Sequence, residues 1–137
     1  MMSKETNIQA LTKFAEAVNT QNWELMYEAV APDAVDHDPA PDQAQGPEGY
    51  IAFFKQFRTA FPDLKVDLVH MVADEDNIAF AYEISGTHQG ELQGIPPTNK
   101  PVKVRGLQIS KFKNGMMTER WGSSDELGIL KQIGHVK

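Results

Sequence analysis

The chain has 137 residues, of which 41% are hydrophobic and 23% charged, which fits one globular domain and excludes a disordered or fibrous protein. Its 19 acidic and 13 basic residues give a formal net charge of −6, which argues against nucleic acid or an anionic membrane as the main partner. Cysteine is absent, so disulfides, thiol nucleophiles and cysteine-ligated metals are excluded. Because no stretch resembles a signal peptide or a membrane span, we expect a soluble, cytoplasmic protein.

The first half of the chain has the apolar spacing of helices. A helix over residues 3–19, capped by Ser3, is predicted by apolar residues at three- and four-residue steps, namely Ile8, Leu11, Phe14 and Val18. A shorter helix, capped by Asn22, is predicted to stop before Pro32. Pro47 suits the first turn of a third helix, which ends at Pro62. This third helix is densely aromatic and predicts a thick apolar wall, formed by Tyr50, Phe53, Phe54, Phe57 and Phe61.

After Pro62 the apolar period changes to two, which predicts strands. We expect strands over residues 64–72, 78–84 and 102–112, a loop over 86–101, and a fourth strand after a hairpin turn at 113–115.

Three details of the last segments are also predicted. Met117, Glu119 and Trp121 are expected to share one face of the fourth strand, with Ser123 and Glu126 capping a last helix that Gly134 closes. Three basic side chains are expected on a solvated face, namely Lys103, Arg105 and Arg120.

Helices followed by strands indicate an α+β fold rather than a parallel βαβ sheet. We predict a single domain over residues 1–137, with three N-terminal helices packed on a curved antiparallel sheet of about four strands and a short C-terminal helix. Such a half-open cone receives a ligand at its mouth. The other face of an antiparallel sheet is free to dock a second copy, so we expect a homodimer.

Asp36, His37 and Asp38 are residue types that bind metals, but they are adjacent in an extended segment. Alternation sends Asp36 and Asp38 to one side and His37 to the other, so we predict no metal site. Two interpretations stay open: hydrogen bonds to nearby backbone, or projection of Asp36 or His37 into a cavity mouth.

His88 has the same parity as Phe80 and Tyr82, which places its imidazole on the ring-lined face if the strand stays regular. There a neutral imidazole can hold a carbonyl. The alternative is a histidine hydrogen-bonded to the loop that follows.

Asp125 lies just past Trp121, in the first turn of the last helix. A helix N-terminus stabilises the ionised carboxylate, whereas burial against Trp121 favours the protonated form that a general acid needs. The sequence leaves both surroundings open.

Four segments occur in an order that resembles the SnoaL-like polyketide cyclases, a family of the nuclear transport factor-like cone superfamily. The resemblance covers nearly the whole chain, and the loop is its most specific part. The segments are Val35-Asp36-His37-Asp38-Pro39, Phe61-Pro62-Asp63-Leu64, the Gly86–Thr98 loop, and Trp121-Gly122 followed by Asp125, Leu127, Gly128 and Gln132.

The resemblance implies a cone fold and a small, apolar or aromatic ligand that contains a carbonyl. In the characterised cyclases one aspartate acts as general acid/base in an intramolecular aldol condensation without metal or other cofactor, and that aspartate falls on Asp125. Asp36 departs from the family, since those cyclases tend to carry an amide there. Gln108 is the nearest match to a polar pair on the third strand, and Lys111 stands where some members have histidine.

We therefore expect a cyclase, lyase or isomerase with Asp125 as its catalytic residue. The expected substrate-binding residues are His88, Trp121, Asp36, His37, Gln108, Phe14, Phe54 and Phe57. Two alternatives stay open: a non-catalytic protein that binds an apolar ligand, and a hydrolase or isomerase of the same fold in which Asp36 holds a water.

Overall fold

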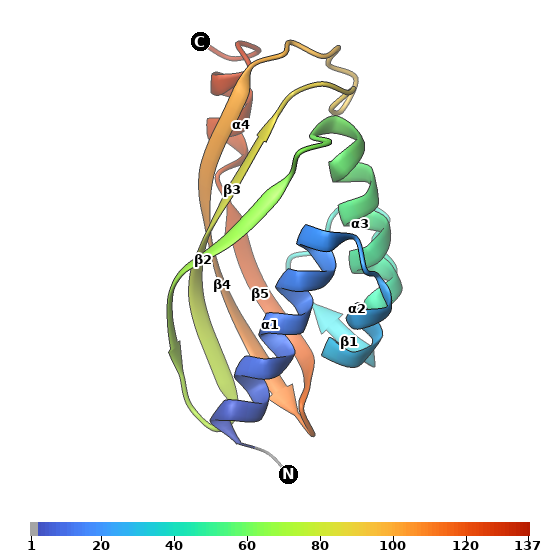
Figure 1. The fold of residues 1–137 in the computed structure, drawn as a ribbon, viewed down its shortest axis with the longest axis vertical. Coiled ribbons are helices and arrows are strands. Elements are labelled where there is room, and N and C mark those ends of the chain that lie inside the picture. Colours follow the sequence, from blue (N-terminus) through green and yellow to red (C-terminus); the bar gives the residue numbers. More distant parts are fainter. Residues whose placement is uncertain (1–2) are drawn as a thin grey trace.

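The computed structural model describes residues 3–137, in which four helices accompany one five-stranded sheet (Figure 1). The helices are α1 (Lys4–Thr20), α2 (Glu24–Ala29), α3 (Pro47–Ala60) and α4 (Glu126–Gln132). The strands are β1 (Val30–Asp36), β2 (Lys65–Ala73), β3 (Asn77–Thr87), β4 (Pro101–Lys113) and β5 (Met116–Ser124). None of these helices is long and apolar enough to cross a membrane.

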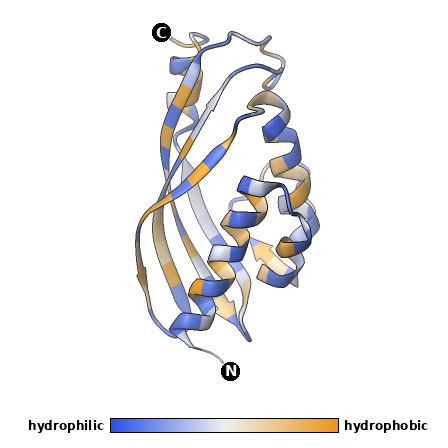
Figure 2. Cartoon of the chain, in the orientation of Figure 1, coloured by the Kyte–Doolittle hydropathy of each residue, from blue (hydrophilic) through white to orange (hydrophobic). Residues whose placement is uncertain are grey.

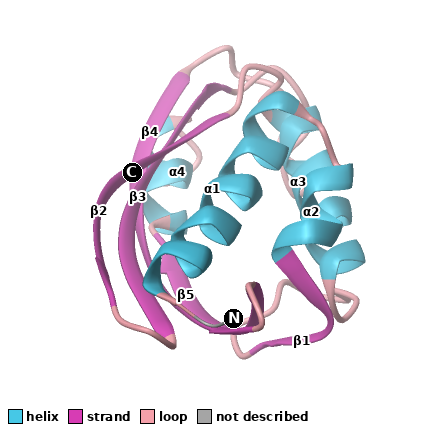
Figure 3. Cartoon of the chain, turned by 60° about the horizontal axis from the view of Figure 1, so that its bottom comes forward, coloured by secondary structure: helices cyan, strands magenta, loops and turns pink. Residues whose placement is uncertain are grey.

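The sheet has the order β1-β5-β4-β3-β2 and curves around the helices, with α1, α2 and α3 on one side (Figure 3). Strands β2 to β5 pair antiparallel, whereas β1 pairs parallel with β5 at its edge. The α+β fold, its three N-terminal helices and its short C-terminal helix are confirmed. The edge strand β1 was not predicted, because Pro32 interrupts its short apolar pattern and a helix immediately precedes it.

Two helices begin as their sequences predict. The Ser3 side chain caps α1 by accepting a hydrogen bond from the backbone N–H of Thr6, and Pro47 lies in the first turn of α3. The Asn19 side chain then ties the end of α1 to the sheet, since it bonds both the N–H and the C=O of Val66 in β2. The predicted Asn22 cap is wrong, because α2 starts after Trp23 without a side-chain cap.

Burial alternates along β4 and defines two faces of the sheet, and the alternation of hydropathy is visible in Figure 2. The face that packs against α1 and α3, here called the concave face, receives even-numbered residues of β4 from Val102 to Phe112. The opposite face, here called the convex face, receives odd-numbered residues such as Leu107 and Ile109, which are exposed.

A β-bulge in β5 corrects two of the predictions. Lys111 pairs with Glu119, but the next residue of β4, Phe112, pairs with Met117, so Thr118 is an extra residue in β5. Met117 is therefore on the concave face, whereas Glu119 and Trp121 are on the convex face. The expected shared face of these three residues is wrong.

The same register places Arg120 on the concave face, because its partner in β4 is the buried Ser110. The expectation of a solvated Arg120 beside Lys103 and Arg105 is therefore wrong for Arg120, although the other two are exposed.

The turns near the C-terminus follow the sequence more closely. Asn114 and Gly115 both have positive φ (54° and 76°), as the hairpin between β4 and β5 requires. Helix α4 is capped by Asp125 rather than by the predicted Ser123 and Glu126 pair. The Gln132 side chain bonds the N–H and C=O of Lys103, so α4 is fixed to β4 where β5 has ended.

Candidate functional site

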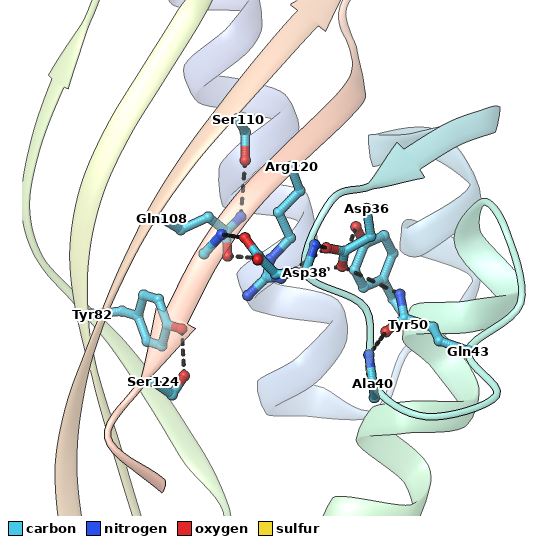
Figure 4. A network of polar contacts seen from close by, with 11 residues as sticks. Asp36, Asp38, Ala40, Gln43, Tyr50, Tyr82, Gln108, Ser110, Arg120 and Ser124 are labelled. Atoms are coloured by element: carbon cyan, nitrogen blue, oxygen red, sulfur yellow. Dashed lines mark hydrogen bonds and ion pairs between the residues drawn. The ribbon is translucent and has the colours of Figure 1, made fainter.

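A group of polar side chains crosses the concave face where β1, β5 and β4 meet (Figure 4). Arg120 Nη1 donates to both carboxylate oxygens of Asp36 at 3.1 Å, and Arg120 Nε donates to Gln108 Oε1 at 2.8 Å. Gln108 Nε2 in turn donates to Ser110 Oγ at 2.9 Å. The Arg120 and Asp36 side chains are only 16% and 7% exposed. Strand alternation brings these side chains to one face, since Gln108 and Ser110 alternate with exposed residues in β4. The pairing of Asp36 with Arg120 adds the edge strand β1 to the row.

The Asp36 carboxylate has no free oxygen lone pair to offer a reaction. Besides Arg120 it accepts from the Tyr50 hydroxyl at 3.0 Å, from Gln43 Nε2 at 3.3 Å and from the Asp38 N–H at 2.9 Å. These bonds fill the roughly four acceptor sites of a carboxylate. Burial and the neighbouring Asp36 charge raise the pKa of the Tyr50 phenol far above its ordinary value, so Tyr50 stays a donor. Asp36 therefore positions Arg120.

Two glycines leave room for planar groups on this face. A Cβ on Gly122 would lie 2.7 Å from Arg120 Nη2, so the guanidinium lies over Gly122. A Cβ on Gly106 would meet the hydroxyl end of the Tyr82 ring, and the Tyr82 hydroxyl lies 2.6 Å from Ser124 Oγ. Because Gly122 pairs with Gln108 and Ser124 with Gly106, all these groups are close neighbours on β4 and β5.

The helices supply an apolar wall opposite this polar row. The Phe14 ring of α1 packs edge-on against the rings of Tyr50 and Phe54 in α3, with centroids 5.3 and 6.0 Å apart. Phe57 continues the wall towards Phe61. The predicted aromatic residues Phe14, Phe54 and Phe57 therefore do lie together on the helical side.

His88 is fully buried at the end of β3, on the ring-lined side that its parity predicts. Its Nδ1 lies 3.0 Å from Thr98 Oγ1 and accepts from the Thr98 N–H at 3.3 Å, so the imidazole also holds the loop that follows. Its ring centroid is 5.7 Å from that of Phe61. Within residues 3–137 its Nε2 has no hydrogen-bond partner. The two interpretations of His88 are thus compatible.

The sequence left two surroundings open for Asp125, the N-terminus of the last helix and burial against Trp121. The structure shows the first. Asp125 Oδ1 accepts from the Gly128 N–H at 2.8 Å and the residue is exposed. Trp121 does not bury it, because Asp125 is itself exposed. Asp125 Oδ2 has no hydrogen-bond partner in the described part of the chain. A catalytic role for Asp125 stays a prediction.

Trp121 and His37 do not join the concave group. Their rings stack on the convex face with centroids 4.4 Å apart and an angle of 9° between planes, and His37 Nε2 lies 3.0 Å from Glu119 Oε1. Exposed apolar side chains surround this stack, and Leu107 and Ile109 are 62% and 49% exposed. Asp38, in contrast, accepts from the Gly122 N–H at 2.9 Å and fixes the segment after β1.

Sequence reasoning missed Arg120 and the polar roles of Tyr50 and Tyr82. Tyr50 was assigned only to the apolar wall, and nothing in the local pattern marks its hydroxyl. The two glycines at 106 and 122 were the available signal, because a glycine inside a strand indicates close approach by another group. No group of three metal-ligating side chains occurs in residues 3–137.

Comparison with known proteins agrees with this architecture. The family model described as SnoaL-like polyketide cyclase matches residues 8–133. This chain belongs to that family. The comparison with curated proteins gives no match.

Solved structures of family members and related proteins share the fold. TsrD from Streptomyces laurentii superposes with a TM-score of 0.90 at 23% identity, covering 99% of this chain and 100% of TsrD. IdmH from Streptomyces antibioticus, provisionally assigned as a polyketide cyclase, gives 0.82 at 29% identity and covers 93% and 98%. AclR from Streptomyces galilaeus, provisionally assigned as a hydroxylase, gives 0.83 at 23% identity and covers 98% and 89%.

Proposed function

We propose that this SnoaL-like protein is a small-molecule enzyme of the polyketide cyclase type, which acts on a flat, apolar, carbonyl-containing ligand held against the concave face. The observation that carries the proposal is the buried Arg120–Asp36–Gln108 row, set among aromatic side chains. An apolar site with a few fixed polar groups is typical of small-ligand binding.

The reaction we infer is an intramolecular aldol ring closure without loss of water (an aldol addition), or a related lyase or isomerase step. A carboxylate takes the proton next to a carbonyl, the resulting enolate carbon bonds to a second carbonyl carbon of the same ligand, and the new alkoxide receives the proton. The sequence of steps conserves all atoms and needs no cofactor.

Asp125 is our candidate for the proton transfers. It directly follows Ser124 of the concave group, and its Oδ2 is not engaged. Asp36 is the weaker candidate, because all its acceptor sites are filled. The filled carboxylate also disfavours the hydrolase alternative, in which Asp36 would hold a water. His88 and Gln108 would contact the ligand, whereas Trp121 and His37 would not.

The deciding experiment follows ring closure of an aromatic ketone with a β-ketoester side chain, by NMR and mass spectrometry. The product has the mass of the substrate. Asp125→Asn should bind the ketone but lose turnover by at least about 100-fold, the usual scale for a lost acid/base. Unchanged turnover would eliminate Asp125. Binding without turnover by the unmodified protein would favour the non-catalytic alternative.

The convex face supports a homodimer. Contiguous exposed apolar residues on an antiparallel sheet are the kind of surface that associates with a second copy. Trp121, Leu107 and Ile109 would form the centre of this interface. A cytoplasmic location stays a prediction from the cysteine-free sequence.

A further inference from the structure

Arg120 has an unused edge. A guanidinium carries five N–H groups. Nη1 bonds both carboxylate oxygens of Asp36, and the N–H on Nε bonds Gln108. In residues 3–137 no acceptor is hydrogen-bonded to Nη2. Since 84% of the side chain is covered, these last two donors are the part of Arg120 that is left to bind a ligand.

The orientation of this edge is fixed. Asp36 holds one side of the guanidinium, Gln108 holds another, and Gly122 lies beneath it. Asp36 is itself anchored by Tyr50, so the arginine cannot easily change its rotamer (Figure 4). Donors held in place before the ligand arrives are the arrangement that stabilises a developing oxyanion.

The surroundings of Nη2 indicate the shape of its acceptor. The Tyr82 ring lies over Gly106, on the strand adjacent to Gly122, so two planar groups lie close to the sheet where other residues would project side chains. Guanidinium and aromatic planes both accept a flat conjugated partner on their open face. The Asp36 charge offsets that of Arg120, so Nη2 acts through its oriented N–H groups, which suit a neutral carbonyl oxygen and the negative charge that develops on it during enolate formation.

We infer that Arg120 Nη2 is the donor that binds the carbonyl oxygen of a flat conjugated ketone and stabilises its enolate. Arg120 is thus a further catalytic residue of the site, and Asp36 its positioning residue. The inference deepens the proposed function by naming the group that recognises the carbonyl, and it makes no use of Asp125.

Two probes of equal size isolate the carbonyl: methyl naphthyl ketone and ethylnaphthalene. Titration calorimetry should show that the unmodified protein binds the ketone at least about 10-fold more tightly, as expected for a hydrogen bond to a charged donor. Infrared spectra of the carbon-13-labelled ketone should show its carbonyl stretch moved to lower frequency in the complex.

Two variants remove the donor in different ways. Arg120→Lys keeps the positive charge beside Asp36 but has no Nη2, and Gly122→Ala keeps Arg120 but places a methyl group 2.7 Å from Nη2. Both should abolish the preference for the ketone and the infrared shift while leaving ethylnaphthalene binding within about 2-fold. Ser123→Ala, on the convex face of the same strand, is the matched control and should change neither.

Each result decides the matter. The inference is overturned if the unmodified protein binds both probes equally or neither, or if the ketone preference persists in both folded variants. Asp125→Asn separates this inference from the proposed function, because it should keep the ketone preference. Ketone preference without any cyclase turnover would refute the proposed reaction and leave the carbonyl site standing.

Discussion

Arg120 and Trp121 are neighbours in β5, yet they serve opposite faces of the sheet. Arg120 is 84% covered and is held by hydrogen bonds to Asp36 and Gln108, whereas Trp121 is 39% exposed and stacks on the ring of His37. The concave face thus has polar groups that orient one another within an apolar wall, and the convex face has apolar groups without cover in residues 3–137. This difference underlies the two proposals, ligand chemistry on the concave face and protein association on the convex face.

The largest effect on stability is expected when the positive charge of Arg120 is removed from the concave face. Arg120→Leu leaves the Asp36 carboxylate buried without its partner, and such a loss costs about 3–5 kcal/mol in the free energy of unfolding. Urea unfolding measures it. The double variant Asp36→Asn/Arg120→Leu should recover much of the loss, and equal stability of Arg120→Leu and the unmodified protein would contradict the buried pair.

Substitutions on the convex face should change the dissociation constant of the proposed dimer rather than the stability of the fold. Trp121→Ala removes the largest exposed ring of the proposed interface and should weaken dimerisation by about 2 kcal/mol or more, the scale of an interface hot spot. Sedimentation equilibrium measures the dimer Kd. If the unmodified protein is monomeric, the proposed interface on the convex face is wrong.

Tyr50→Phe tests the outer support of Arg120. Loss of the hydroxyl bond to Asp36 should lower the free energy of unfolding by about 1.5 kcal/mol at neutral pH. Because the pKa of Tyr50 is raised in the folded state above its ordinary value of 10.0, its contribution to stability is full below pH 10 and falls as the tyrosine of the unfolded chain ionises above that pH.

The difference in stability between the unmodified protein and Tyr50→Phe should therefore narrow as the pH rises past 10. Denaturant titrations at several pH values measure this. A difference that stays constant to high pH would show that Tyr50 ionises alike in both states.

Glu119→Gln should have the smallest effect. Glu119 bonds His37 at 3.0 Å on the convex face, but both side chains are about one-third exposed, and exposed pairs contribute less than about 1 kcal/mol. Thermal unfolding of Glu119→Gln and of Arg120→Leu compares the loss of stability on the two faces of one strand. A loss as large as that of Arg120→Leu would mean that the two faces do not differ in this respect.

Much of the fold follows from local pattern. The stripe of α1, the proline at the start of α3, the period of two after Pro62 and the Asn114-Gly115 turn each had one physical interpretation. The inward position of His88 also followed from parity alone, because β3 is regular up to that end.

The candidate site was less accessible, because its residues meet through long-range pairing. Asp36 and Arg120 are 84 residues apart in the chain and are joined only by the parallel β1–β5 pair. Asp125 had two opposing influences, the helix N-terminus and burial against Trp121, and only the exposure of Asp125 in the folded chain decided which surroundings it has.

The bulge at Thr118 decides which side chains of β5 face the helices. If Thr118 kept its place in a regular alternation from Met117 onward, Arg120 would turn towards the outer surface and Trp121 towards the helices. The extra residue therefore keeps Met117 and Arg120, three positions apart in the chain, on the same face. Loss of the bulge without loss of a residue would exchange the concave and convex side chains of this half of β5 at once, without any substitution in either set.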